Sequence, residues 1–474
     1  MTDPVVNITN LNLRYGQKAV LRGLDWVIQA GEHWLLCGPS GTGKTSLAKA
    51  IAARTPEAHY VANWYQFTDL EGQSNFYYQQ RYNSQATATT ASVSKELRNY
   101  GQKHQLDFER LDALLEAMGF SALQDSALIE LSSGEHKKLQ LVKALWLKPA
   151  VLILDQPYNG LDIHSRQNLN ALLESLSESG STLILISNDL EIPSCINRYA
   201  EIRDGKLIEV GAQERSMGDH EQHINAVPEF LREAPAPVSP VVISMKNVNI
   251  SYGEKQVLKN INWEVTAGEK WLLQGHNGSG KSTLLSLITG DHPQAYANDF
   301  HLFGHKRGTG ESIWEIKERI GMISPELHWY FDPSATVWQS VVSGFYDSSG
   351  LYCDPGYTRT EQANELLGYF GLSEYRNVLM NTLPLGKQRL ALLARTIIKN
   401  PQLLILDEPC QGLDQAQTRY FNQLVDELCQ NGTTLIYVGH FESQLPACLE
   451  KRILLENGAL KSIEDMAEKI ELIN

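Results

Sequence analysis

The pattern of residues in this chain of 474 occurs twice, in register. Early matches are 237 positions apart, as Lys281 minus Lys44 shows, and later matches are 252 apart, as Asp407 minus Asp155 shows. The early pairs are Tyr15 and Tyr252, Trp26 and Trp263, Gly31 and Gly268, Trp34 and Trp271, and Lys44 and Lys281. The later pairs are Ser132 and Pro384, Asp155 and Asp407, Asp162 and Asp414, and Asn188 and His440. Two constant offsets indicate a duplicated structural unit, with 252 minus 237, or 15, extra residues in the second copy.

The repeat predicts two domains, 1–232 and 242–474, joined by the Pro-rich linker EAPAPVSPV at 233–241. In each copy, buried apolar runs read as parallel strands, and amphipathic patterns after Gly-rich turns read as helices. The fold class is therefore α/β. The extra residues lie between Lys281 and Pro384, where Gly, Ser and Asp around 343–357 favour a loop. The spaced apolar residues of 458–474 are consistent with a short amphipathic helix packed at the domain edge.

Each copy contains a phosphate-binding loop of the form G-x-x-x-x-G-K-[ST], placed between an expected strand and an expected helix. Glycines in such a loop let consecutive main-chain N–H groups face phosphate oxygens, and the helix adds the positive end of its dipole. A structural Gly-rich turn would explain one isolated match, but two matches at repeated positions favour nucleotide binding. The first loop comprises Gly38, Pro39, Ser40, Gly41, Thr42, Gly43, Lys44 and Thr45. The second comprises Gly275, His276, Asn277, Gly278, Ser279, Gly280, Lys281 and Ser282.

A magnesium site is expected beside each loop. Thr45 and Ser282 end the two motifs with hydroxyl groups, and the apolar runs VLILD and LLILD end in Asp155 and Asp407. A hydroxyl and a carboxylate are the oxygen donors that hold Mg²⁺ against nucleotide phosphates. The expected cofactors are therefore ATP and Mg²⁺, with Lys44 and Lys281 reaching the β and γ phosphates.

The segments LSSGE at 131–135 and, more weakly, LPLGK at 383–387 resemble the signature of the ATP-binding cassette (ABC) superfamily. The resemblance covers nearly the whole chain, twice. It implies two cassettes packed head to tail within one chain, with each ATP held between the phosphate loop of one cassette and the signature of the other. It also implies that Tyr15 and Tyr252 stack on adenine.

By this resemblance, the composite site on the second phosphate loop is complete. Glu408 would polarise the attacking water, His440 would contact the γ phosphate, and Lys281 would hold the phosphates. The signature of the first copy would close this site through Ser132, Ser133 and Gly134. A glutamine loop is also implied, at Gln79 or Gln80 in the first copy, whereas the second copy has Pro325 followed by Glu326 near that place.

The site on the first phosphate loop departs from the family three times. Gln156 replaces the catalytic glutamate, Asn188 replaces the switch histidine, and Pro384 replaces the signature serine. Loss of one positioned base typically slows a reaction about 10²- to 10⁴-fold. We therefore expect nucleotide to bind at this site but to turn over poorly.

Features outside the nucleotide sites have to indicate which process such an ATPase drives. Acidic residues outnumber basic ones by 55 to 41, so nucleic-acid or ribosome binding is not expected. The linker is neither long nor charged, as tandem-cassette translation factors would require, and the six cysteines form no CxxC pair of the kind found in DNA-repair cassettes. No expected segment spans a membrane. The pattern resembles tandem cassettes of bacterial molybdenum transport, which implies a cytoplasmic ATPase, at most peripheral on the inner membrane, working with integral membrane permeases. Two alternatives remain open: a soluble ABC ATPase that acts on ribosomes or in DNA repair, and the ATPase of a sugar importer with one strong and one weak site.

Overall fold

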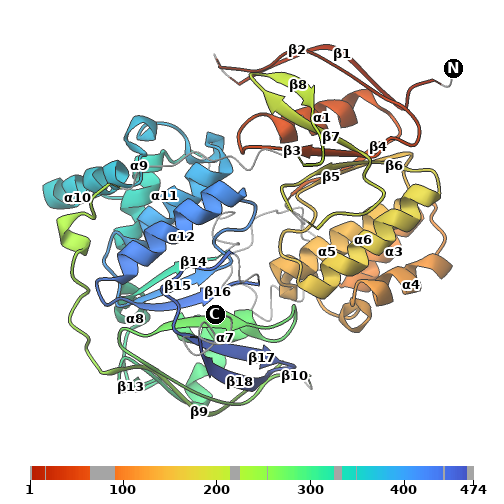
Figure 1. Cartoon of the computed structure of the whole chain (residues 1–474). Helices are drawn as coiled ribbons and strands as arrows, with labels where there is room; N and C mark the ends of the chain where they lie inside the picture. Colours follow the sequence, from red (N-terminus) through yellow and green to blue (C-terminus); the bar gives the residue numbers. More distant parts are fainter. Residues whose placement is uncertain are drawn as a thin grey trace, which may run out of the picture. The chain divides into compact units, whose positions relative to one another are not determined.

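The chain divides into two compact units, the first built mainly from residues up to 220 and the second mainly from 221 onward. The structure is a computed structural model that describes residues 3–15, 18–63, 91–189, 191–213, 225–252, 255–324, 332, 334–348, 350–440 and 444–466 (Figure 1). The segment before the Pro-rich linker belongs with the second unit, earlier than the repeat predicts. Its main chain is bonded there, because Asn400 Nδ2 donates to the carbonyl of Phe230 and Asn431 Nδ2 to that of Leu231, both at 3.0 Å.

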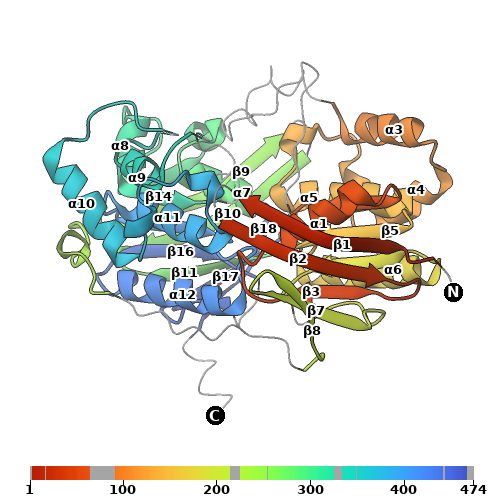
Figure 2. The ribbon, with the colours of Figure 1, turned by 90° about the horizontal axis from the view of Figure 1, so that it is seen from above.

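A six-stranded sheet in the order β4-β5-β6-β3-β7-β8 forms the centre of the first unit. All its neighbouring strands are parallel except β7 and β8. A separate antiparallel ribbon, drawn in red in Figure 2, pairs β1 with β2. The strands are β1 Val6–Tyr15, β2 Lys18–Ile28, β3 Trp34–Cys37, β4 Ala58–Val61, β5 Val151–Asp155, β6 Thr182–Ile186, β7 Arg198–Arg203 and β8 Lys206–Glu209.

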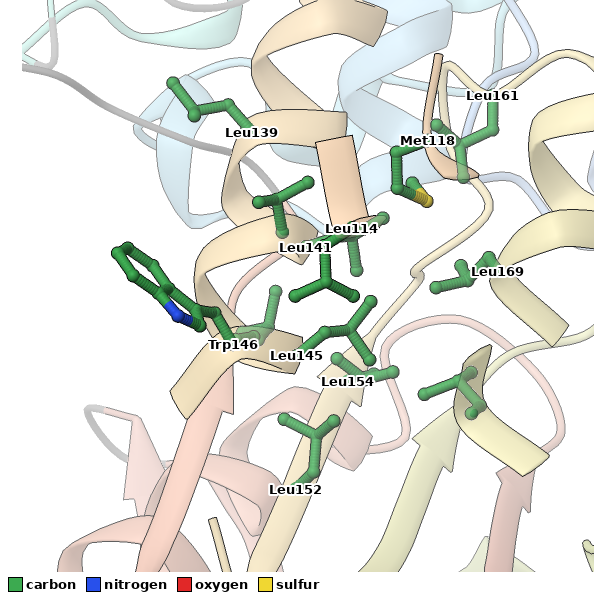
Figure 3. Packing of buried hydrophobic residues seen from close by; sticks show 14 of the residues in the cluster. Leu114, Met118, Leu139, Leu141, Leu145, Trp146, Leu152, Leu154, Leu161 and Leu169 are labelled. Carbon is green, nitrogen blue, oxygen red and sulfur yellow. The ribbon is translucent and has the colours of Figure 1, made fainter. Parts of the chain in front are cut away.

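Helices cover both faces of this sheet. The phosphate-loop helix α1 buries Leu47 and Ile51 in one apolar cluster with the ribbon and one sheet face. The other face packs against the remaining helices, and Figure 3 shows Leu145 and Trp146 of α5 beside Leu152 and Leu154 of β5. The helices are α1 Lys44–Arg54, α3 Val93–His104, α4 Glu109–Ala117, α5 Ser133–Leu147 and α6 Ile163–Glu178.

The second unit repeats this plan. Its six-stranded sheet has the order β14-β15-β16-β11-β17-β18, and its antiparallel sheet has the order β10-β9-β12-β13. The strands are β9 Val241–Tyr252, β10 Lys255–Thr266, β11 Lys270–Gln274, β12 Asp299–Leu302, β13 His305–Lys306, β14 Ile320–Ile323, β15 Leu403–Asp407, β16 Thr434–Val438, β17 Lys451–Glu456 and β18 Ala459–Asp465. The helices are α7 Lys281–Ile288, α8 Ile313–Arg319, α9 Val337–Val342, α10 Gly356–Tyr369, α11 Leu385–Ile397 and α12 Gln415–Cys429. The predicted α/β class and the two similar units are thus confirmed.

Two local expectations were wrong. In the first unit only residues 55–57 separate α1 from β4, whereas in the second unit residues 289–319 separate α7 from β14 and contain β12, β13 and α8. The largest insertion therefore follows the phosphate-loop helix, inside the predicted interval from Lys281 to Pro384 but not at 343–357. The repeat offset shows only a net difference, because the second unit is shorter between β14 and α9 than the first is between β4 and α3.

The second wrong expectation concerns the carboxy-terminal segment. Ala459–Asp465 forms a strand that pairs antiparallel with β17, not an amphipathic helix. The three-residue spacing of Leu460 and Ile463 resembles a helical repeat, but the open edge of β17 offers main-chain hydrogen bonds along the whole segment. Residues 467–474 lie outside the described part of the chain.

Candidate nucleotide sites

Both phosphate loops connect the central strand of a parallel sheet to a buried helix, as predicted. Gly43 and Gly280 immediately precede α1 and α7, with left-handed φ angles of 107° and 104°. A Cβ at Gly43 would lie 2.6 Å from Val20 Cγ1, and a Cβ at Gly280 would lie 2.8 Å from Leu258 Cδ2. Both the backbone conformation and the close approach of the ribbon therefore require glycine at these positions.

The two loop lysines fold back over their own loops. Lys44 Nζ donates to the carbonyls of Gly38 and Pro39, at 2.6 Å each. Lys281 Nζ donates to the carbonyls of Gly275, at 2.7 Å, and His276, at 3.1 Å. Burial lowers the pKa of Lys44 to about 8. Each ammonium group thus lies over its own loop, and the lysine of such a loop is the residue that holds β and γ phosphates.

Oxygen donors suited to Mg²⁺ meet beside the first loop. Thr45 Oγ1 donates to Asp155 Oδ2 at 2.7 Å, so α1 and β5 bring the expected hydroxyl and carboxylate together. Tyr60, at the end of β4, also donates to Asp155 Oδ2, at 3.0 Å. Burial and the neighbouring Asp155 raise the pKa of this phenol. In the second unit Ser282 lies in the first turn of α7 and Asp407 ends β15. The residues therefore fit a hydrated magnesium ion held by one carboxylate and one hydroxyl.

A carboxylate and an imidazole meet at the end of β15. Glu408 Oε1 lies 2.8 Å from His440 Nε2, and Gln411 Nε2 donates to Glu408 Oε2 at 3.1 Å. Glu408 has a left-handed φ of 45°, and its N–H donates to the carbonyl of Val438. This sparsely populated conformation turns the carboxylate toward the residue that follows β16. The predicted partners Glu408 and His440 are therefore in direct contact.

The corresponding turn of the first unit has the same backbone and different side chains. Gln156 has a φ of 48°, and its N–H donates to the carbonyl of Ile186 at 2.9 Å. Asn188 Oδ1 accepts the N–H of Gly38 at 3.0 Å. The amide that replaces the switch histidine thus binds the phosphate loop itself.

The two signature segments differ at the start of their helices. Ser132 caps α5 through a reciprocal pair of bonds, in which its Oγ accepts the N–H of Glu135 at 3.3 Å and Glu135 Oε2 accepts the N–H of Ser132 at 2.7 Å. Ser133 and Gly134 follow in the first turn. Pro384 precedes α11 and provides no side-chain cap. Only the first signature therefore places a hydroxyl at the helix start.

The structure describes the side chain of one of the two expected adenine-stacking residues, Tyr252. Tyr252 ends β9 and is 40% exposed, and its hydroxyl lies 2.7 Å from His292 Nε2. His292 comes from the insertion after α7, and burial lowers the pKa of this imidazole to about 4. Tyr15 ends β1, but its side chain lies outside the described part of the structure, as do the glutamine-loop candidates Gln79, Gln80, Pro325 and Glu326.

Sequence reasoning missed two residues that support the first site. Tyr60 is one, and Lys137 of α5 is the other. Lys137 Nζ donates to the carbonyls of Ala62, Asn63 and Asp155 at 3.0, 3.1 and 3.4 Å. Burial lowers the pKa of Lys137 to about 7. Lys137 thus connects α5 to the ends of β4 and β5 beside Asp155. No sequence motif identifies this lysine.

Comparisons with known proteins agree with this geometry. A family model described as ABC transporter matches residues 21–159 and 258–411. The chain is 35% identical over 449 residues to the ABC transporter ATP-binding protein ModF of Escherichia coli (strain K12), which covers 90% of this chain and 91% of the relative. It is also 30% identical over 483 residues to an uncharacterized ABC transporter ATP-binding protein of Schizosaccharomyces pombe, covering 96% of this chain and 98% of the relative.

One solved structure is similar over nearly the whole chain. The archaeal ribosome recycling factor aABCE1, in complex with the ribosomal stalk protein aP1, has a TM-score of 0.55 at 17% identity and covers 98% of this chain and 92% of its own. At this identity the likeness concerns the fold alone. No helix in the described ranges is both long and apolar enough to cross a bilayer. The two family matches and the full-length relatives place the chain in the ABC transporter family, as a tandem-cassette ATPase that binds and hydrolyses ATP.

Proposed function

We propose that this ATPase hydrolyses ATP at one composite site and holds ATP with little turnover at the other. The hydrolytic site would combine the second phosphate loop, Glu408 and His440 with the signature at Ser132, Ser133 and Gly134. The contact between Glu408 and His440 carries the proposal, since a carboxylate accepts a proton from water whereas the amide of Gln156 does not.

The residues of this site divide the work between them. Lys281 and the loop N–H groups would bind the phosphates, and Glu408 would orient the attacking water and receive its proton. His440 holds the carboxylate in place and would donate to the γ phosphate. When bound, Mg²⁺ supplies positive charge against the phosphate oxygens, held by Ser282 and Asp407 in this cassette and by Thr45 and Asp155 in the first. Tyr252 would stack on adenine, and Tyr15 would do so in the first cassette.

The first cassette would complete the non-hydrolytic site with LPLGK at 383–387. Its phosphate loop and its Thr45–Asp155 pair suit nucleotide binding. Gln156, Asn188 and Pro384 each lack the group that the hydrolytic site uses. Sharing the sites in this way requires the two cassettes to pack head to tail, so that ATP at either site draws them together.

We further propose that the cycle drives a molybdate, or related, transporter from the cytoplasmic face of the membrane, through separate integral membrane permeases. The support is the full-length similarity to ModF, whose name describes an ABC transporter ATP-binding protein. Resemblance to tandem cassettes of molybdenum transport supplies the substrate.

Isolation of the proteins bound to an ATP-trapped variant tests which partner this ATPase drives. The Glu408→Gln protein should keep ATP bound and its cassettes closed, so we would isolate it with ATP from gently solubilised cells. The matched control is the Glu408→Gln, Lys281→Ala protein, which should not hold nucleotide at the hydrolytic site. Recovery of a permease needed for molybdate uptake, absent from the control, would support the proposal. Recovery of ribosomes, DNA or a sugar permease in its place would overturn the molybdate assignment.

A further inference from the structure

A buried glutamate lies directly behind the phosphate loop of the first cassette. Glu201 of β7 is the register partner of Cys37, the last residue of β3 before the loop. Its side chain is fully buried, and a Cβ on Gly38 would lie 3.4 Å from Glu201 Cγ and 3.5 Å from its Cδ. Cys37 Sγ lies 3.9 Å from Glu201 Oε1. The carboxyl group is thus packed against the first residues of the loop.

One charge partner of Glu201 lies on its solvent side, and the carboxylate also acts electrostatically on the loop lysine Lys44. Arg203 Nε donates to Glu201 Oε2 at 2.9 Å, and Arg203 Nη2 lies 2.8 Å from the same oxygen. The Arg203 side chain is 50% exposed, whereas that of Glu201 is fully buried. The ion pair therefore has its negative end toward the loop and its positive end toward water, where solvent screens it.

In the second cassette an apolar residue occupies the register position that corresponds to Glu201. There, Gln274 ends the strand before the loop, and its register partner on β17 is Leu454. The two sheets superpose in register up to this pair, since Trp34 pairs with Arg198 as Trp271 pairs with Lys451. Glu201 is therefore specific to the cassette whose site we propose to be non-hydrolytic.

We propose that Glu201 lowers the affinity of the first phosphate loop for ATP and narrows its preference for ATP over ADP. A phosphate loop attracts anions through its N–H groups and helix dipole, and a carboxylate behind it opposes that attraction. The opposition grows with the charge of the ligand, so a triphosphate loses more than a diphosphate.

This inference rests on the proposed function, and it assigns a role to the Glu201 carboxylate at a site that does not hydrolyse ATP. A site that does not hydrolyse ATP cannot weaken its own ligand by removing the γ phosphate. At such a site ATP leaves only by dissociation of the intact molecule. Weaker binding shortens the residence time of ATP, because affinity differences in related sites lie mainly in the dissociation rate.

Nucleotide titration of the full chain tests the inference. Lys281→Ala would be present in every protein, so that the probe, methylanthraniloyl-ATP, reports the first loop, with unlabelled ATP and ADP as competitors. Glu201→Gln keeps the shape of the side chain and removes its charge. We expect ATP to bind about 3- to 10-fold more tightly and to dissociate more slowly, with a smaller gain for ADP.

Arg203→Gln provides a second arm at a half-exposed position. It removes the counter-charge and keeps the carboxylate, so ATP should bind more weakly than to the parent protein. Equal or weaker ATP binding by Glu201→Gln, or equal gains for ATP and ADP, would overturn the inference alone. If the Glu201→Gln protein did not fold, unchanged ATP binding by Arg203→Gln would overturn it. Absence of nucleotide from the first loop in all proteins would contradict both the inference and the proposed non-hydrolytic site.

Discussion

The two cassettes share the backbone of the turn after the magnesium carboxylate but differ in the side chains that it presents. Gln156 and Glu408 have nearly the same left-handed φ, 48° and 45°, and both donate their N–H groups to the adjacent strand. Only Glu408 contacts a switch residue, because Asn188 binds the phosphate loop instead. The same backbone conformation is therefore retained where an amide replaces the carboxylate, and fold similarity alone does not identify a hydrolytic site.

A second difference concerns the segments and side chains next to the two phosphate loops. The second cassette inserts β12, β13 and α8 after its phosphate-loop helix, and this segment supplies His292 to Tyr252. The first cassette instead places Glu201 behind its loop and Tyr60 on its magnesium carboxylate. Each cassette thus modifies the shared scaffold with residues that the other does not have.

Lysine substitution should separate the cassettes most strongly. Lys281→Ala should lower ATP turnover by about 10²- to 10³-fold, because a loop donor to the transferred phosphate is lost. Lys44→Ala should have a much smaller effect on turnover, since the first loop only holds nucleotide. Steady-state phosphate release measures both. Similar losses in the two proteins would erase the proposed functional difference.

The switch residues provide the next comparison. His440→Ala should reduce kcat by about 10- to 100-fold, because Glu408 loses the imidazole that positions it. Asn188→His should not create a second active site while Gln156 and Pro384 remain. A gain of turnover in Asn188→His would mean that the first site needs only one repair.

Loss of a single half-buried hydroxyl should have a modest effect on the first unit. Tyr60→Phe removes the donor to Asp155, and we expect the free energy of unfolding to fall by about 1 kcal/mol. Urea unfolding followed by circular dichroism measures it, with Tyr252→Phe as the matched control in the second unit. If Tyr60→Phe had a higher free energy of unfolding than the parent protein, the hydrogen bond from Tyr60 to Asp155 would not stabilise the first unit.

The last comparison concerns the pH dependence of stability in the second unit. Burial lowers the pKa of His292 to about 4 from an ordinary value near 6.5, so the folded protein binds fewer protons than the unfolded chain between these values. The contribution of His292 to stability is therefore present above about pH 6.5 and is lost as the pH falls toward 4. Melting curves of His292→Asn should show a shallower decline over this window. If His292→Asn lost stability as steeply as the parent protein over this pH window, His292 would not contribute to the pH dependence.

Local patterns predicted much of this molecule. The run KTSLAKAIAAR became α1 at Lys44–Arg54, because its motif glycine, helix-forming residues and apolar spacing all act within a few residues. Asp155 and Asp407 end buried strands as their apolar runs indicate. Glu408 and His440 were identified because the repeat aligns them with Gln156 and Asn188 of the first copy. In the fold these positions follow neighbouring strands at one edge of the sheet.

Long-range contacts account for what the sequence did not reveal. Lys137 bonds Ala62, 75 positions away, Tyr60 bonds Asp155, 95 positions away, and Glu201 pairs with Cys37 on a neighbouring strand. A lone Lys, Tyr or Glu has no sequence pattern that identifies it. The strand Ala459–Asp465 depends on the edge of β17, and the true place of the insertion depends on two opposing length differences. Such features require strand registers, which a single sequence does not specify.

The central claim is that one glutamate carries hydrolysis, and steady-state ATPase rates of Glu408→Gln and Gln156→Glu test it most directly. Glu408→Gln should lose turnover by about 10²-fold or more while still binding ATP, because the water loses its base. Gln156→Glu should stay close to the parent rate, because Asn188 and Pro384 are unchanged. Retention of most activity by Glu408→Gln, or a marked gain by Gln156→Glu, would contradict the assignment of the two sites.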